Sequence, residues 1–241
     1  MGNSALVLLS AIVNSFGLLL AGSFLAIGLG PEVYGYYISS IALATLISFF
    51  ANLGITQFIL KKFGQLGLEA YKLLRPSLQI IIFTSSISLC FIISLYWLVP
   101  SHIHGFYAIL IMCFYLIGQV FTELMSSVYQ LQEKYKKLSL LPLIPNFAKL
   151  ICFGALLYSN YLELHLRSVS YVFFFALILL ITLNIKSLNN FKSKKITHVR
   201  FTDPKIMNDQ NSTSLSTLSI LKESLPFSLT GLFHFVIFKV I

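Results

Sequence analysis

Long apolar runs alternate with short polar gaps along the whole chain. Residues 5–27 and 36–60 contain no Asp, Glu, Lys or Arg. Because an α-helix rises about 1.5 Å per residue, each run is long enough to cross the roughly 30 Å hydrocarbon core of a bilayer. The complete runs are 5–28, 36–60, 78–99, 106–130, 138–158 and 169–185, and a further run begins near Leu225. The pattern predicts an all-α integral membrane protein with six transmembrane helices and the start of a seventh.

These runs divide the chain into three predicted parts. Residues 1–186 are expected to form a six-helix transmembrane bundle. The polar stretch 187–224 reads as a basic cytoplasmic loop, and its last part, 214–224, carries leucines at helical spacing beside Ser and Lys. That spacing predicts a short amphipathic helix on the membrane surface. The alternative is a solvated segment that connects to the next span, since it would have the same sequence pattern. Residues 225–241 are expected to form an incomplete seventh transmembrane helix.

Basic residues set the predicted orientation. The chain is 57% hydrophobic and has 17 Lys and Arg against 8 Asp and Glu, so its formal net charge is +9. Of these 17 basic residues, 14 lie in the gaps 61–77, 131–137 and 186–223. The gaps 29–35, 100–105 and 159–168 contain only Arg167. The positive-inside rule therefore places the three basic gaps, and with them the N-terminus, in the cytoplasm. The same clustering argues against nucleic acid as a partner.

The segment GLGPEVYGYY, residues 28–37, separates the first two runs. Gly28 and Gly30 free the backbone, and Pro31 lacks the N–H that would continue a helix, so we expect the first helix to stop there. The tyrosines expected to anchor the turn at the headgroup level are Tyr34, Tyr36 and Tyr37. The segment therefore predicts a helical hairpin.

Two stretches resemble a known family of membrane proteins. One is LGPEVYGYYISSIALATLISFFANLGITQFILKKFG, residues 29–64, which contains an LGP-E-x-YG turn followed by Asn52-Leu53-Gly54. The other is LKESLPFSLTGLFHF, residues 221–235. Both resemble bacterial polysaccharide flippases, the O-antigen and capsule branch of the multidrug/oligosaccharidyl-lipid/polysaccharide exporter superfamily. Members of that family have two pseudo-symmetric halves, so the chain resembles an N-terminal half with a stub of the next span.

The resemblance implies a function and a place in the cell. The expected function is translocation of polyprenyl-diphosphate-linked oligosaccharide across the bacterial cytoplasmic membrane, for O-antigen or capsule synthesis. The implied partners are membrane lipid, the lipid-linked cargo and other polysaccharide-assembly proteins. Since the chain resembles only one half, we expect a truncated form that does not flip its cargo alone. The alternatives are a non-transporting scaffold of the assembly machinery and an inactive gene remnant.

Polar side chains at membrane depth are the candidates for cargo binding, because burying them in lipid is costly without a partner or a cavity. They are Asn14, Asn52, Gln57, Gln119, Glu123, Asn146, Lys149 and Lys239. The candidate cavity residues among them are Lys149, Glu123, Asn14, Asn52 and, more weakly, Lys239. For the Asn and Gln side chains, a hydrogen bond between helices is favoured over a cargo contact.

Lys149 is the most informative of these residues. It lies about 11 residues, or ~16 Å, into its run, near the middle of the bilayer. An unpaired Lys there costs roughly 2.5–3.5 kcal/mol on insertion scales, so it requires a partner, a cavity or a bound anion. Two interpretations stay open: a structural ion pair with Glu123, and a cavity position that serves the diphosphate of the cargo.

Enzyme and metal chemistry have little support in the sequence. The chain has two Asp residues, Asp203 and Asp209, both in the polar loop, and no Gly-rich phosphate loop follows a strand pattern. His102 and His104 form an H-x-H pair without a third nearby ligand. We therefore expect no enzymatic activity, no cofactor and no metal site.

Overall fold

The computed structural model describes residues 2–66, 74–95, 103–158, 165–193 and 217–239, and the regular structure within these ranges is entirely helical. The helices are α1 (Gly2–Asn52), α2 (Ile55–Leu66), α3 (Leu74–Ser94), α4 (Ile103–Leu131), α5 (Tyr135–Tyr158), α6 (Leu166–Ser193) and α7 (Thr217–Lys239). Five of them, α1, α3, α4, α5 and α6, are long and apolar enough to cross a membrane. These helices confirm the predicted all-α class with membrane-length helices, while the number of spans and their orientation stay predictions.

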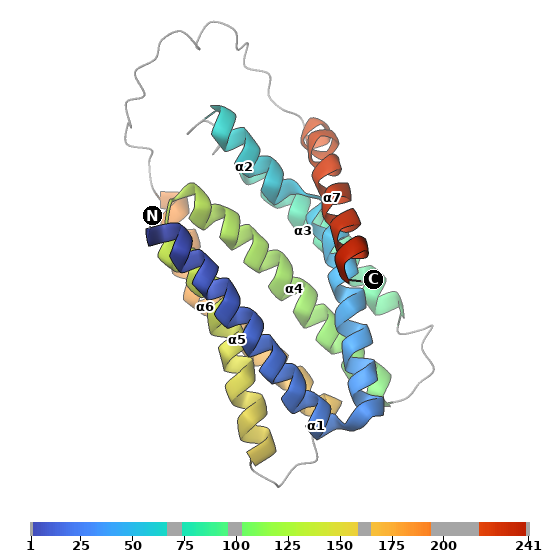
Figure 1. The fold of residues 1–241 in the computed structure, drawn as a ribbon. Coiled ribbons are helices and arrows are strands. Elements are labelled where there is room, and N and C mark those ends of the chain that lie inside the picture. Colours follow the sequence, from blue (N-terminus) through green and yellow to red (C-terminus); the bar gives the residue numbers. More distant parts are fainter. Residues whose placement is uncertain (1, 67–73, 96–102, 159–164, 194–216, 240–241) are drawn as a thin grey trace, which may run out of the picture.

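Helix α1 contains the predicted hairpin, but its break is sharper than expected. Only Gly30 leaves the helical conformation, with φ 74° and ψ 166°, a region that is open almost only to glycine. Figure 1 shows a first arm descending to this point and a second arm rising from it. Pro31 does not end the first helix but is the first residue of the second arm. At this position a backbone N–H would have no carbonyl partner within the helix, so proline is tolerated. We refer to residues 2–29 and 31–52 as the first and second arms.

The second predicted run, 36–60, is not one continuous helix. α1 ends at Asn52 and α2 begins at Ile55, because Leu53 and Gly54 adopt positive φ angles of 47° and 67°. Hydroxyls from neighbouring helices donate to backbone carbonyls at this break. The Thr84 hydroxyl of α3 donates to the Ala51 carbonyl at 2.5 Å, and the Ser228 hydroxyl of α7 donates to the Phe49 carbonyl at 3.3 Å. Such side-chain donors are what allow a helix to break at membrane depth.

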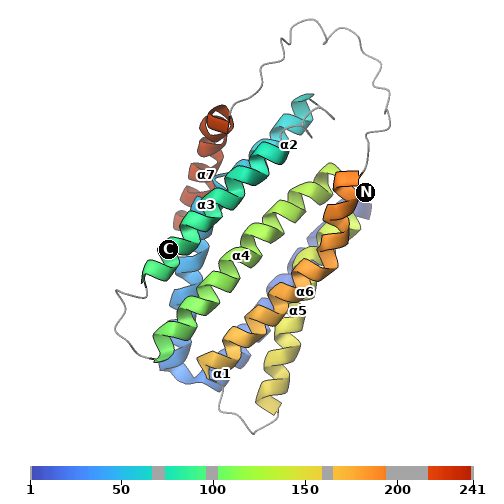
Figure 2. The ribbon, with the colours of Figure 1, turned by 180° about the vertical axis from the view of Figure 1, so that it is seen from behind.

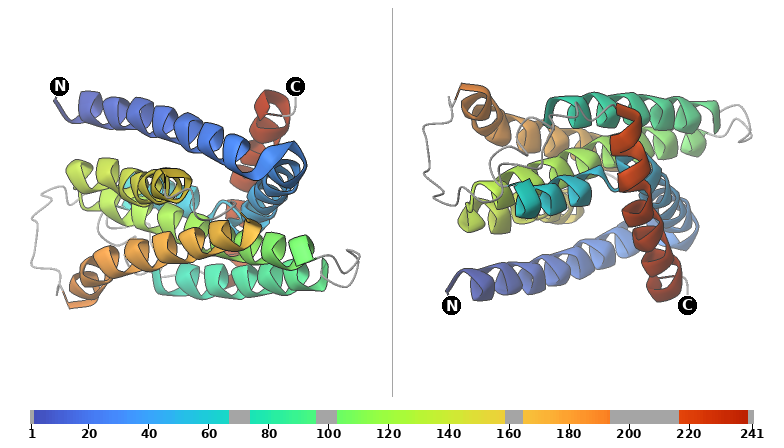
Figure 3. Two further views of the ribbon diagram at one scale, coloured as in Figure 1. Left: turned by 90° about the horizontal axis from the view of Figure 1, so that it is seen from below. Right: turned by 90° about the horizontal axis from the view of Figure 1, so that it is seen from above.

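Helix α4 runs through the centre of the bundle and joins its two sides (Figures 1 and 2). On one side it packs with the first arm, α5 and α6 around Leu25, Ile111 and Phe153. On the other side it packs with α2, α3 and α7 around Ile59, Leu124 and Ile220. A further cluster joins α4 to the second arm and α3. Seen from below and from above, the first arm of α1 and α6 lie on opposite sides of α4 (Figure 3).

The outer surface of the bundle is apolar. Large side chains are exposed on several helices, including Leu19 (70% exposed), Ile27 (77%), Ile82 (64%) and Ile151 (68%). A soluble protein would bury such residues, whereas lipid chains provide them with apolar surroundings. The exposed surface thus agrees with the apolar runs that predicted membrane insertion.

The ends of the helices separate into two groups. The N-terminus, the end of α2, the α4–α5 turn, the end of α6 and the start of α7 lie together at the top of Figure 1. The bend at Gly30, the end of α5 and the start of α6 lie at the opposite end. Each basic gap therefore adjoins the first group of helix ends. That this end faces the cytoplasm stays a prediction.

The C-terminal parts of the chain differ from the predicted boundaries. α6 continues to Ser193, beyond the expected end of the bundle at residue 186. α7 is one continuous helix from Thr217 to Lys239, so the expected surface helix at 214–224 and the expected span from residue 225 are not separated by a break. Residues 194–216, which include most of the expected basic loop, lie outside the described residues.

Candidate functional site

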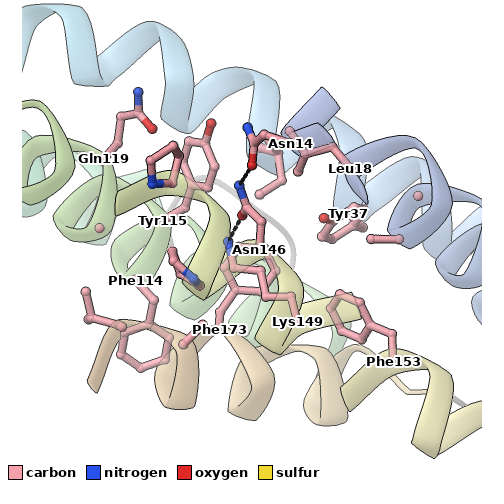
Figure 4. A pocket seen from close by; sticks show the side chains of 18 of the residues that line it. Asn14, Leu18, Tyr37, Phe114, Tyr115, Gln119, Asn146, Lys149, Phe153 and Phe173 are labelled. Atoms are coloured by element: carbon pink, nitrogen blue, oxygen red, sulfur yellow. Dashed lines mark hydrogen bonds between the residues drawn. The ribbon is translucent and has the colours of Figure 1, made fainter. Parts of the chain in front are cut away.

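A cavity of about 710 Å³ lies between both arms of α1 and helices α4, α5 and α6. Its polar lining consists of Asn14, Ser23, Tyr34, Tyr37, Tyr115, Gln119, Thr122, Asn146 and Lys149. Figure 4 shows that Asn14, Tyr115 and Lys149 come from three different helices and lie around this cavity. A volume of this size falls within the ~300–1,000 Å³ range of small-molecule sites.

Two prolines shape the α5 wall of the cavity. Pro142 and Pro145 lie inside this helix, and both line the cavity. A proline provides no N–H, so the carbonyls of Leu138 and Leu141, four residues earlier, lose their helical donors. Such interruptions are tolerated in membrane helices where the backbone is buried in protein or faces a cavity. Lys149 follows one turn after Pro145 on the same helix.

The Lys149 ammonium lies over the Phe173 ring of α6, 4.4 Å from the ring centroid. It also donates a long hydrogen bond of 3.4 Å to Asn146 Oδ1. Within the described part of the chain the one ion pair joins Lys62 to Glu223, so no carboxylate there neutralises Lys149. An ammonium has three donors. Lys149 can therefore accept an anion at the cavity without giving up an ion pair.

Asn146 connects the lysine to the first arm of α1. Its Nδ2 donates to Asn14 Oδ1 at 2.8 Å, while its Oδ1 faces Lys149. The dashed lines in Figure 4 trace this chain from Asn14 through Asn146 to Lys149. The structure thus brings together two predicted cavity residues, Asn14 and Lys149, through Asn146, which forms a hydrogen bond between α5 and the first arm of α1.

Aromatic residues form much of the remaining lining, and the sequence pattern did not indicate a site for them. Tyr34 and Tyr37 stack with ring centroids 5.9 Å apart, and Tyr37 packs against Phe173 at 6.2 Å. Tyr115 contacts the same phenylalanine at 6.4 Å. Tyr34 and Tyr37 therefore do not act as outward-facing anchors, because the helix that begins at Pro31 turns them inward. Tyr115 lies inside a predicted run, so its polar hydroxyl at membrane depth was the available signal.

Glu123 and Asn52 belong to a second polar cluster and do not line the cavity. The Glu123 carboxylate accepts hydrogen bonds from Asn52 Nδ2 and, at 3.3 Å, from Gln119 Nε2. The alternative of an ion pair with Lys149 is wrong, because α4 directs Glu123 toward the α1–α2 break instead of toward α5. Gln119 contacts both regions, since it lines the cavity and also donates to Glu123.

Two predicted candidates remain, and one of them, Gln57, does not line the cavity. Gln57 is exposed and accepts a hydrogen bond of 3.0 Å from the Thr56 hydroxyl. The backbone of Lys239 ends α7, but its side chain lies outside the described residues. No group of three His, Cys, Asp or Glu side chains in the described ranges could hold a metal ion.

No protein-family model, curated protein or solved structure matches the chain.

Proposed function

We propose that the chain binds polyprenyl-diphosphate-linked oligosaccharide and takes part in its translocation across the bacterial cytoplasmic membrane for surface polysaccharide synthesis. The observation that carries this proposal is Lys149, a cation on the wall of a cavity among helices long enough to span a membrane, without an ion-pair partner in the described residues. Charged groups at membrane depth mark substrate pathways in transporters.

The chemistry of the cavity suits the polar end of such a lipid. A lysine binds phosphate as a point charge, so the diphosphate would lie beside Lys149. Asn14 and Asn146 offer amides, and the hydroxyls of Tyr34 and Tyr115 offer further hydrogen bonds, to the sugar. The polyprenyl chain needs no cavity, because it can remain in the bilayer beside the apolar outer surface.

The proposal includes six membrane-spanning segments, with each arm of α1 counted as one. Each arm is long enough for a span, since about 20 residues are required. It also includes the cytoplasmic location of the basic gaps. Under this arrangement the cavity would open alternately to the two sides of the membrane, as in other secondary transporters.

Photo-crosslinking tests whether the cargo enters the cavity. A photoreactive amino acid would replace Leu18, which lines the cavity, or, as the control, Phe83, which is 67% exposed and lies outside it. Membranes that synthesise lipid-linked oligosaccharide would be illuminated and the protein–glycolipid adducts quantified. We expect adducts at Leu18 that Lys149→Ala diminishes, and few at Phe83. Equal yields at the two positions would refute the proposal, and adducts with other proteins alone would favour a scaffold.

A further inference from the structure

A second, smaller cavity of about 180 Å³ lies between α4, α5 and α6, near the α4–α5 turn. Its lining residues are Tyr129, Lys137, Leu140, Leu141, Ile144, Pro145, Leu180, Leu183 and Asn184. The α4–α5 turn and the end of α6 lie at the same end of the bundle (Figure 2). The volume is below the ~300–1,000 Å³ of sites that enclose a whole small molecule, so this cavity fits one part of a larger ligand.

Lys137 supplies the charge at this smaller cavity. Its side chain is exposed, and its ammonium lies 5.9 Å from the centroid of the Tyr129 ring. Within the described part of the chain it forms no ion pair, and no carboxylate lines the cavity. Lys137 directly precedes the apolar run 138–158, so its ammonium lies where the polar gap meets the hydrocarbon core. Lipid phosphates lie at this depth, and basic pockets between membrane helices bind lipid headgroups.

Asn184 of α6 offers a buried donor on the inner side of the same cavity. Its Oδ1 accepts a hydrogen bond of 2.6 Å from the Tyr129 hydroxyl, and its Nδ2 donates to the Leu180 carbonyl at 2.7 Å. The side-chain amide has two N–H groups, so one of them has no acceptor among the described residues. Buried donors are nearly always paired, so this N–H indicates a ligand that brings an acceptor oxygen. A phosphate provides such oxygens.

An apolar surface continues from Lys137 toward the middle of the membrane. Leu140 and Ile144 follow Lys137 on one face of α5, at positions i+3 and i+7, and both are exposed. They lie about 4.5 Å and ~10 Å deeper along the helix, within one leaflet of about 15 Å. Leu183, also exposed, lines the cavity from α6. A cation followed by an apolar surface matches a phospholipid, in which the phosphate precedes the acyl chains.

We propose that the smaller cavity binds an anionic phospholipid of the phosphatidylglycerol type. The phosphate would lie beside Lys137 and Asn184, and one acyl chain would follow Leu140, Ile144 and Leu183. The single cation at the cavity favours a headgroup with a net negative charge. Phosphatidylcholine carries the same phosphate, but its own quaternary ammonium neutralises it and would be repelled by Lys137.

The lipid site is distinct from the Lys149 cavity, and it does not depend on the proposed function. A volume of about 180 Å³ leaves no room for the oligosaccharide of a lipid-linked cargo. Pro145 and Leu180 nevertheless line both cavities. A bound phospholipid would therefore pack against α5 and α6 at the wall that these helices contribute to the larger cavity.

Native mass spectrometry of the purified 241-residue chain tests the site, with phosphatidylglycerol, phosphatidylcholine and inorganic phosphate as the probes. We expect one phosphatidylglycerol to bind more tightly than phosphatidylcholine, and inorganic phosphate at the same concentration not to displace it. Lys137→Ala should weaken phosphatidylglycerol binding about fivefold or more, because it removes the cation that meets the phosphate. Lys136→Ala is the matched control and should bind like the wild type, since Lys136 is exposed in the same helical turn but does not line the cavity.

A substitution that leaves every charge unchanged tests the acyl-chain part of the site. Leu183→Trp should obstruct the apolar surface and weaken phosphatidylglycerol binding, whereas Ile185→Trp should not. Ile185 is as exposed on α6 as Leu183, 51% against 53%, but lies outside the cavity. Size-exclusion chromatography would establish that each variant is folded.

Four results would each overturn the proposal. They are equal binding of phosphatidylglycerol and phosphatidylcholine by the wild-type chain, displacement of the lipid by inorganic phosphate, equal affinities of folded Lys137→Ala and Lys136→Ala, and equal affinities of folded Leu183→Trp and Ile185→Trp. The first would reduce the site to ordinary contact with bulk lipid, and the second would assign it to a free anion.

Discussion

The hydrogen bond between Asn14 and Asn146 joins the first arm of α1 to α5 across 132 positions of sequence. Because such bonds in membrane proteins contribute about 0.6 kcal/mol on average, we expect a coupling free energy of that size. A double-mutant cycle with Asn14→Ala and Asn146→Ala would measure it from the free energy of unfolding in detergent. Additive single effects, without coupling, would show that the two amides do not interact.

The polar residues at membrane depth could be found from the sequence, but their partners could not. Lys149, Asn14 and Asn146 were recognised because apolar runs surround them, and the structure places all three at the cavity. The direction in which each helix faces depends on packing against its neighbours. Glu123 and Lys149 lie on consecutive helices, yet Glu123 bonds to Asn52. The sequence therefore predicts how deep in the membrane a residue lies along its helix, but not which neighbouring helix its side chain faces.

At the scale of helices, the bend at Gly30 depends on a backbone conformation and not on packing. A Cβ added at Gly30 would meet nothing within 4 Å, but its φ of 74° is strained for any other residue. We expect Gly30→Ala to lower the free energy of unfolding by about 1–3 kcal/mol. Gly35→Ala is the matched control, because this glycine is helical, exposed and equally open. Equal stabilities of the two variants, measured by unfolding in detergent, would contradict the assignment of the bend to Gly30.

Gly54 differs from Gly30, because it is closely packed against α7 in addition to having a positive φ angle. A Cβ there would lie 2.7 Å from the Ser224 carbonyl oxygen and 2.7 Å from the Ser228 nitrogen, so α7 would have to move. We expect Gly54→Ala to cost about 1–3 kcal/mol from overpacking alone. It should also reduce zero-length carbodiimide cross-linking of the Lys62–Glu223 ion pair, whose atoms are 2.8 Å apart.

Gly35→Ala again serves as the control for this cross-link, because it lies in the second arm and leaves the contact with α7 unchanged. Undiminished cross-linking in Gly54→Ala would mean that α7 is not held by this glycine. The break itself was not predictable from the apolar pattern, because Leu53 and Gly54 interrupt no hydrophobic run. The hydroxyls of Thr84 and Ser228, distant in sequence, donate to the Ala51 and Phe49 carbonyls beside the break.

At the scale of the whole molecule, the two groups of helix ends make the predicted orientation testable. Cys90, Cys113 and Cys152 would first be replaced, and single cysteines introduced at Glu32 and Lys136, which are exposed at opposite ends. A membrane-impermeant maleimide added to intact cells should label Glu32→Cys and not Lys136→Cys. The reverse labelling pattern would show that the orientation of the protein in the membrane is opposite to the predicted one.

The membrane class and most helices followed from the length of the apolar runs, because helix rise and bilayer thickness leave few alternatives. The cavity did not follow, since it depends on how α1, α4, α5 and α6 pack together. Tyr37 illustrates the difference. Its position after the turn was read as an anchor in the headgroups, but the single-residue bend at Gly30 brings it against Phe173.

The affinity of the purified chain for polyprenyl diphosphate tests most directly whether the Lys149 cavity binds a lipid-linked anion. Dissociation constants would be compared for the wild-type chain, Lys149→Ala, Lys149→Arg and the control Lys136→Ala, which removes an exposed cation at the end of the bundle. A hydrogen bond to a charged group contributes about 1.5–3 kcal/mol, so Lys149→Ala should weaken binding about tenfold or more. Lys149→Arg should bind with intermediate affinity, because it keeps the charge but changes its geometry, and Lys136→Ala should match the wild type. Wild-type affinity in a folded Lys149→Ala protein would contradict the role assigned to this cavity.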